Sequence, residues 1–285
     1  MEGIFRMELN LAVRGHDFYR EDTAERLAEK IAETGLKNIQ FALPFSFPSV
    51  PSQFENMNPG MGNYYQRIFS KQDIQITVLS CYINMIHPDL NEREKLIDKF
   101  CSYLRVAKAF GASMVATETG CVDEEIHYTE ENFTEEAFEK VVESVKKMVT
   151  YAEKLGMTVA IEGGLNHPIY SPKKMRELLD RIQSPNMQVI LDVTNFLRPD
   201  TVQDQKEVID EAFNLFGSEI AAIHLKDFVV ENNLVKPVSI GTGEMDFEYL
   251  LKKVSQEKPY LHLIMEETKE PDIPNAIAYL EKINK

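Results

Sequence analysis

The chain has 285 residues, of which 44% are hydrophobic and 27% charged, and its formal net charge at pH 7 is -15. No apolar run approaches the roughly 20 residues that span a bilayer, which argues against a membrane protein. The acidic balance, without a basic stripe, argues against nucleic acid as a partner. We therefore expect a soluble globular protein with a small-molecule ligand.

The cysteine content and the first residues indicate the compartment. Cys81, Cys101 and Cys121 are an odd number without a Cys-x-x-Cys pair, so neither a disulfide framework nor a structural zinc knuckle is expected. We interpret them as free thiols that serve packing. Met1 to Arg6 lack the basic start and long apolar stretch of a secretory signal. The cytoplasm is the expected location.

Strand-like and helix-like segments alternate along the whole chain. Leu27 and Ile31 show helical spacing before a stop at Gly35, and Thr134 is an N-cap followed by acidic residues. Strands are predicted at 7–13, 37–43, 75–83, 113–119, 158–162, 187–192, 220–227 and 261–267, and helices at 21–34, 64–71, 92–110, 134–155, 171–182, 202–216, 247–255 and 274–283.

Two stretches do not fit this alternation. Pro44 to Gly62 is rich in Pro, Ser, Asn and Gly and is predicted to be a long loop over one end of the fold, with a lid as one possible use. The chain after Asp227 makes an excursion up to Gly243 before the next helix.

Eight strand–helix pairs predict the fold class. The first strand is not followed by a Gly-x-Gly-x-x-Gly turn, which disfavours an open dinucleotide-binding sheet. The expected fold is α/β, a single (β/α)8 TIM barrel over residues 1–285. In such barrels the chemistry lies at the carboxyl ends of the strands.

Four acidic or imidazole side chains stand where a short apolar run gives way to polar residues. Each belongs to a different predicted strand in the second half of the chain, so all four are expected to converge at one end of the barrel. They are Glu162, Asp192, His224 and Glu266.

The alternation of side chains along a strand decides which acid of the last strand faces inward. Leu263 and Met265 form an apolar face suited to the covering helices, and Glu267 continues that face. Ile264 and Glu266 lie on the other face, so Glu266 is the predicted member. The same count places the other three of the four residues inward.

Electrostatics predicts what lies between these four side chains. Three converging carboxylates repel by about 4 kcal/mol per close pair at an effective dielectric constant of about 20, and a divalent cation removes that conflict. Three oxygen-bearing ligands and one imidazole favour Mn²⁺ or Mg²⁺, with Co²⁺ or Zn²⁺ also possible. The alternative is that each residue is a separate strand-end cap.

The strand ends also resemble a known family. The stretches VAIEGG, LDVTN, IHLKD, GTGEMDF and LIMEET are similar to successive strand-end motifs of the xylose-isomerase-like sugar isomerase/epimerase superfamily. The resemblance covers the whole chain in strand order and is specific mainly from Thr158 to Thr268. It implies that Glu162, Asp192, His224 and Glu266 are metal ligands, and that Glu162 and Glu266 are also the catalytic acid/base pair.

The mechanism that the resemblance implies is proton abstraction beside a carbonyl of a ketose or related polyol. Return of the proton to the same carbon from the other face gives an epimer, and return to the adjacent carbon gives an aldose. Loss of a β-hydroxyl would instead make the enzyme an inosose-type dehydratase. The expected function is a metal-dependent isomerase or epimerase, with this lyase as an alternative.

The chain departs from the ketose epimerases of this superfamily at two substrate contacts. Asn195 stands where those enzymes have a His three residues after the Asp ligand, and Val230 stands where they have an Arg six residues after the His ligand. These differences count against ketose 3-epimerisation in particular and leave the metal site intact. Asn195 remains a candidate substrate contact, against a structural role in a turn.

Several further residues are candidate substrate contacts. Lys226 shares the parity of His224 and could bind a hydroxyl or carboxylate, against a solvated loop lysine. His167 follows the fifth strand at loop distance, although an exposed histidine is the simpler interpretation. Glu118 and Asn10 could line the pocket from their strands. His262 is interpreted as a satisfied interior residue, and Asp227 as a cap or supporting partner.

The glycine turn before the eighth helix bears on phosphate binding. Gly241 and Gly243 lie where many barrels bind phosphate, but Glu244 and Asp246 would compete with it, and Asp246 fits an N-cap. An unphosphorylated sugar, inosose or related polyol is therefore favoured.

Two rival functions and the assembly state complete the expectations. An abasic-site endonuclease of the same superfamily would need a histidine-rich zinc site and a cationic face, which six scattered histidines and the acidic charge do not offer. A non-catalytic sugar-binding descendant stays open. Homo-oligomer formation is possible.

Overall fold

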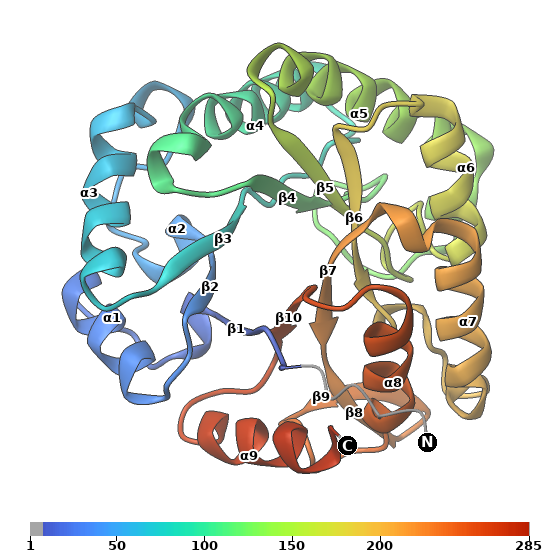
Figure 1. Cartoon of the computed structure of the whole chain (residues 1–285). Coiled ribbons are helices and arrows are strands. Elements are labelled where there is room, and N and C mark those ends of the chain that lie inside the picture. Colours follow the sequence, from blue (N-terminus) through green and yellow to red (C-terminus); the bar gives the residue numbers. More distant parts are fainter. Residues whose placement is uncertain (1–7, 285) are drawn as a thin grey trace.

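Eight parallel strands close into a barrel in the computed structural model, which describes residues 8–284. Going around the barrel, β1 is followed by β10, β7, β6, β5, β4, β3 and β2 (Figure 1). The predicted (β/α)8 TIM barrel is confirmed. The barrel strands are β1 (Leu11–Arg14), β2 (Asn38–Phe41), β3 (Gln75–Ser80), β4 (Met114–Glu118), β5 (Thr158–Glu162), β6 (Met187–Asp192), β7 (Ile220–Leu225) and β10 (His262–Met265).

The helices form a ring outside the strands (Figure 1). Local capping sets their ends: in α5 the Thr134 hydroxyl accepts from the Ala137 N–H at the start, and Gly156 ends the helix in the left-handed conformation with φ 59°. In the described part of the chain no helix is both long and apolar enough to cross a membrane. The helices are α1 (Ala24–Glu33), α2 (Leu43–Ser46), α3 (Pro59–Lys71), α4 (Leu90–Phe110), α5 (Glu135–Leu155), α6 (Pro172–Ile182), α7 (Gln205–Phe216), α8 (Phe247–Glu257) and α9 (Ile273–Ile283).

The alternation of side chains creates two apolar layers. A small cluster inside the barrel contains Ala160, Ile190, Ala222 and Ile264, whereas their strand neighbours join the larger layer under the helices. The inward parity expected from the sequence is thereby confirmed. The residues two positions after these four are the candidate ligands Glu162, Asp192, His224 and Glu266, which therefore stand above the inner layer.

The segment predicted as one long loop, Pro44 to Gly62, is more regular than expected, and that prediction is wrong. It contains most of α2, a 3-10 turn at Phe54–Asn56 and the start of α3 at Pro59. The Asn58 side chain accepts from the Met61 N–H at 3.1 Å, so an Asn-Pro helix start was present in the sequence. The first strand, predicted to start at Met7, starts at Leu11 in the structure. Met7 itself lies outside the described residues.

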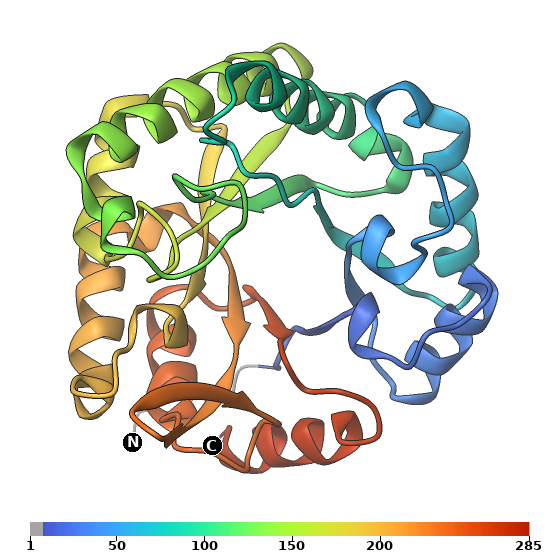
Figure 2. The same ribbon diagram turned by 180° about the vertical axis from the view of Figure 1, so that it is seen from behind.

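The excursion before Gly243 is an antiparallel hairpin of β8 (Asp227–Glu231) and β9 (Leu234–Val238). β7 ends at Leu225 and not at the predicted Asp227, because Asp227 is already the first residue of β8. The hairpin lies beside α9 in the view from behind (Figure 2), and the Ser239 hydroxyl near its end bonds Asp272 at the start of α9.

Glu267 does not continue the helix-facing side of the last strand, as the sequence suggested. It has a positive φ of 55°, so the alternation stops after Glu266, and the Glu267 carboxylate pairs with Arg14 at 2.8 Å. The choice of Glu266 as the inward acid is unaffected.

Asp227 fixes the hairpin and the glycine turn to each other. Its buried carboxylate accepts the backbone N–H groups of Phe228, Gly241, Gly243 and Met245 at 2.8 to 3.0 Å. Gly243 has to be glycine because an added Cβ would lie 2.3 Å from the Asp227 carboxylate. The interpretation of Asp227 as a supporting partner agrees with these contacts.

We predict that Asp227→Ala lowers the free energy of unfolding by about 3 kcal/mol, because several buried N–H groups would lose their acceptor. Urea unfolding followed by circular dichroism measures this change. The control is Glu231→Gln at the exposed tip of the same hairpin, which should change stability by less than about 0.5 kcal/mol. Equal stability of the two variants would contradict the anchoring role.

Candidate metal centre

Four side chains from four strands meet at the carboxyl end of the barrel. Glu162 and Asp192 are the last residues of β5 and β6, His224 lies near the end of β7, and Glu266 directly follows β10. All are buried, and one ligand atom from each lies within 4.8 Å of the others. We call these four residues the barrel cluster. The structure brings together the set that the sequence singled out.

His224 is the centre of the barrel cluster. Its Nδ1 lies 3.0 Å from Glu162 Oε1 and 2.6 Å from Glu266 Oε2, and its Nε2 lies 2.8 Å from Gln40 Oε1. The Gln40 amide nitrogen in turn donates to the hydroxyls of Ser80 and Tyr82. Gln40 Oε1 therefore accepts the Nε2 proton and orients the ring. Loss of the Nδ1 proton, which faces the two carboxylates, would leave a lone pair there for a metal ion.

Two cationic side chains border the barrel cluster. Lys226 Nζ lies 2.6 Å from Asp192 Oδ2 and 3.0 Å from Glu266 Oε1. Arg14 Nη1 lies 2.9 Å from Glu266 Oε1, and its Nε is held by Asp17 at 2.7 Å. Both cations are buried, so they offset part of the negative charge that the three carboxylates concentrate.

The pKa values show how strongly these charges interact. Burial raises the pKa of the Glu162 carboxyl to about 7, although His224 opposes that rise. Burial would also raise the pKa of Glu266, but His224 and Lys226 outweigh it and hold that pKa well below the usual value. For His224, burial disfavours the charged ring, yet Glu162 and Glu266 raise its pKa to about 10. The cluster as a whole thus favours bound positive charge.

Two buried carboxylate oxygens indicate where a cation fits. Asp192 Oδ2 and Glu266 Oε2 are held by ion pairs with Lys226 Nζ and His224 Nδ1, each at 2.6 Å, and neither oxygen has a further hydrogen-bond donor. Each oxygen therefore has a lone pair left for a cation. Carboxylate oxygens and one imidazole nitrogen are ligands that divalent ions accept. The donor set therefore fits one divalent metal ion.

A cavity of about 680 Å³ opens above the barrel cluster. Its lining includes four of the predicted substrate contacts and Glu266, and Leu234 of the β8–β9 hairpin forms part of its wall. The volume lies within the range of small-molecule sites. The predicted contacts that line it are Glu118, His167, Asn195 and Lys226.

Asn195 joins Glu162 of the barrel cluster to the neighbouring Lys226. Its amide nitrogen donates to Glu162 Oε1 at 2.9 Å, and its carbonyl oxygen accepts from Lys226 Nζ at 2.8 Å. Asn195 and Lys226 are therefore close enough to contact a ligand of the cluster. Lys226 is buried, which excludes the solvated-lysine interpretation. Val230 is half-buried and packs against the outer core, so it adds no polar group to the cavity.

His167 is buried, and the simpler interpretation of an exposed loop histidine is wrong. Its Nδ1 lies 2.8 Å from the Gly120 carbonyl, so this nitrogen donates and Nε2 faces the Glu118 carboxylate at 3.5 Å. Opposite charges offset the burial of both groups: the pKa of His167 is raised and that of Glu118 is lowered. The pair forms a polar wall of the cavity.

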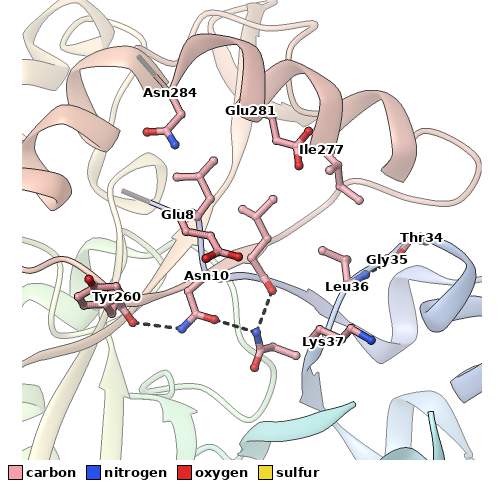
Figure 3. Close-up of a pocket in the computed structure, with 13 residues that line it drawn as sticks. Glu8, Asn10, Thr34, Gly35, Leu36, Lys37, Tyr260, Ile277, Glu281 and Asn284 are labelled. Atoms are coloured by element: carbon pink, nitrogen blue, oxygen red, sulfur yellow. Dashed lines mark hydrogen bonds between the residues drawn. The ribbon is translucent and has the colours of Figure 1, made fainter. Parts of the chain in front are cut away.

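Asn10, predicted as a substrate contact, lies away from this cavity. It precedes β1, so it lies at the amino-terminal end of the barrel, where its amide donates to the Tyr260 carbonyl (Figure 3). The same amide nitrogen lies 3.0 Å from His262 Nδ1. The cavity there is larger, about 1010 Å³, but it is remote from the four ligand atoms. His262 has a partner in Asn10, as expected for a satisfied residue.

Sequence reasoning missed Arg14 and Gln40. Arg14 follows the apolar run Leu11–Val13 in the same way as the four ligands follow theirs, so the strand-end signal was present. Gln40 is a polar residue between the buried Ile39 and Phe41, which marks an inward position of a strand. Neither could be assigned a partner before the strand order was known.

The chain belongs to the xylose isomerase-like TIM barrel family, whose model matches residues 28–283. The resemblance seen in the strand-end motifs is thereby confirmed. No curated protein sequence matches the chain significantly.

Solved structures share the fold at low sequence identity. A D-tagatose 3-epimerase-like protein has 16% identity and a TM-score of 0.74, with 96% of each chain covered. The IolI protein with a bound zinc atom has 16% identity and a TM-score of 0.73, covering 96% of this chain and 95% of its own. A xylose isomerase-like protein from Mycobacterium smegmatis in complex with magnesium has 12% identity and a TM-score of 0.73, with 98% of each covered.

We predict that Gln40→Met weakens Mn²⁺ binding by about 10- to 100-fold, because the variant removes the acceptor that fixes the His224 ring. Isothermal titration calorimetry on both proteins measures the affinity. Gln75→Met, an exposed position at the start of β3, is the matched control and should bind as the parent does. Unchanged affinity of Gln40→Met would contradict the orienting role.

Proposed function

We propose that this protein is a divalent-metal-dependent isomerase or epimerase that moves a proton at the carbon beside a carbonyl of a ketose or related polyol. The observation that carries the proposal is the convergence of three carboxylates and one imidazole under a cavity of ligand size. In this proposal Glu162, Asp192, His224 and Glu266 hold the ion. A location in the cytoplasm and a homo-oligomeric state stay predictions.

The ion is proposed to be Mn²⁺ or Mg²⁺, and Co²⁺ or Zn²⁺ also suit the donor set. When bound, it would neutralise the carboxylates and polarise the substrate carbonyl. The zinc and magnesium in two structural neighbours support a divalent ion in this fold without fixing its identity here.

Glu162 and Glu266 are proposed to move the proton. They stand on β5 and β10, which β6 and β7 separate, so the two carboxylates flank Asp192 and His224 from opposite sides. One carboxylate would remove the proton and the other would return it, and positioned proton transfer of this kind is worth roughly 10²- to 10⁴-fold in rate. Asn195, which donates to Glu162, would hold that carboxylate in place.

The proposed substrate contacts are the polar groups of the cavity. Lys226 and Asn195 would bind hydroxyl or carbonyl oxygens next to the barrel cluster, and the Glu118–His167 pair would contact the far end of the ligand. The amides of Gly241, Gly243 and Met245 already donate to Asp227. This supports an unphosphorylated substrate, because these N–H groups are not free for a phosphate.

Proton exchange tests the function. The Mn²⁺-loaded protein, incubated with ketoses and inososes in D₂O, should place deuterium at the carbon beside the carbonyl, as detected by NMR and mass spectrometry. Glu162→Gln and Glu266→Gln should each reduce this exchange at least ~100-fold, because each removes one proton-transfer group. The control Glu248→Gln changes an exposed acid of α8 that lies outside the barrel cluster and its cavity.

Exchange in both Gln variants at the parent rate would show that the acid/base assignment is wrong. A product lighter than the substrate by one water would identify the dehydratase alternative. Substrate binding without deuterium incorporation would instead identify a non-catalytic sugar-binding protein.

A further inference from the structure

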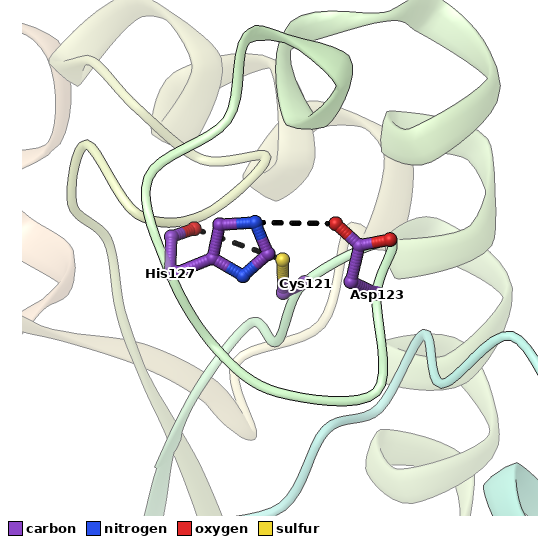
Figure 4. Close-up of side chains that lie close together, drawn as sticks. All are labelled: Cys121, Asp123 and His127. Carbon is purple, nitrogen blue, oxygen red and sulfur yellow. Dashed lines mark hydrogen bonds and ion pairs between the residues drawn. The ribbon is translucent and has the colours of Figure 1, made fainter.

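We propose a second metal site, outside the barrel, that takes a borderline divalent ion such as Zn²⁺. Its ligands are Cys121, Asp123 and His127 in the loop after β4, which we call the loop cluster (Figure 4). One ligand atom from each lies within 4.8 Å of the others. His127 Nε2 and Asp123 Oδ2 are 3.3 Å apart, about the separation of two ligands on a tetrahedral ion with bonds near 2.0 Å.

The orientation of the His127 ring favours a cation at Nε2. Its Nδ1 lies 3.0 Å from the Glu125 carbonyl oxygen, which can only accept, so Nδ1 carries the proton. A second proton on Nε2 makes the contact with Asp123 an ion pair, whereas in the neutral ring two acceptors face each other. A metal ion between Nε2 and the carboxylate would take the place of that proton. A backbone carbonyl on the second nitrogen is the usual support of a metal-binding histidine.

The sulfur of Cys121 has one donor and one acceptor around it: its thiol donates to the His127 carbonyl oxygen at 3.7 Å (Figure 4). The buried Asn132 side chain accepts the Val122 N–H at 2.9 Å and donates to the Asn166 carbonyl at 2.9 Å, which fixes the orientation of its amide. The same amide nitrogen lies 3.5 Å from Cys121 Sγ and therefore donates to it. A metal ion on the sulfur would take the place of the thiol proton, and the Asn132 amide would remain as a hydrogen-bond donor to the bound sulfur.

A second buried asparagine holds the backbone of the loop cluster. Asn84 Oδ1 accepts the Cys121 N–H at 3.0 Å, and its amide nitrogen donates to the Asp123 carbonyl at 2.7 Å. Cys121 is buried, whereas the Asp123 and His127 side chains are each 52% exposed. The ion would therefore rest on the sulfur from the solvent side, with the fourth coordination position open to water.

Sulfur, imidazole and one carboxylate together favour Zn²⁺ over Mg²⁺ or Ca²⁺. The thiol proton would leave to water on binding, so affinity should rise with pH. The loop cluster also borders the candidate active site: Tyr128 lines the cavity over the barrel cluster, and the Gly120 carbonyl holds His167. An ion here would fix that wall of the cavity, a role beyond the packing expected for Cys121 from the sequence.

Co²⁺ as a probe tests the loop cluster separately from the barrel cluster. Only a cysteine-ligated ion gives thiolate-to-cobalt charge-transfer absorption, and the barrel cluster contains no sulfur. The full-length protein should show this absorption on titration with Co²⁺, and Zn²⁺ should abolish it by displacement. Cys121→Ala and His127→Ala should each lose the absorption and bind one ion fewer per chain than the parent.

Matched controls make the result decisive. Cys101→Ser changes another thiol and Glu124→Gln changes a neighbouring exposed acid, and both should keep the absorption. His127 is exposed, so its variant is expected to fold, and circular dichroism checks this. Asp192→Asn should leave the absorption unchanged while reducing metal binding at the barrel cluster, which separates failure of this site from failure of the proposed function. Absorption that is missing in the parent, or kept in folded His127→Ala, overturns the proposal.

Discussion

The repulsion among three buried carboxylates is the constraint on which the carboxyl end of this barrel is built. Glu162, Asp192 and Glu266 are placed together by strand order, and each close pair costs about 4 kcal/mol at an effective dielectric constant near 20. Lys226 and Arg14 offset part of this cost through ion pairs with Asp192 and Glu266. A divalent ion would offset the rest.

The same constraint explains the supporting residues. A metal ligand has to be oriented as well as present, and His224 is oriented by Gln40, whose own amide is fixed by two hydroxyl groups. Asn195 bonds both Glu162 and Lys226, so it holds a carboxylate of the cluster and the neighbouring cation in place. Asp227 plays a structural part by collecting the amides of the glycine turn. The result is a rigid rim around a cavity of ligand size.

The sequence allowed the fold and the barrel cluster to be predicted because both follow from local patterns. Apolar runs alternating with helical spacing specify a barrel, and a polar residue at the end of each run marks the active end. Arg14 and Gln40 were missed because their importance depends on contacts between strands far apart in the chain. Asn10 was misplaced because its strand begins at Leu11, which puts it at the opposite end, and the burial of His167 depends on the Gly120 carbonyl.

The most direct test of the account is a crystal structure of the protein grown with Mn²⁺, with anomalous diffraction to locate the ion. The account predicts one anomalous peak in the barrel within about 2.5 Å of ligand atoms from Glu162, Asp192, His224 and Glu266. An ion bound elsewhere in the barrel, or a barrel cluster that stays metal-free at saturating Mn²⁺ with Lys226 still paired to Asp192, would contradict it.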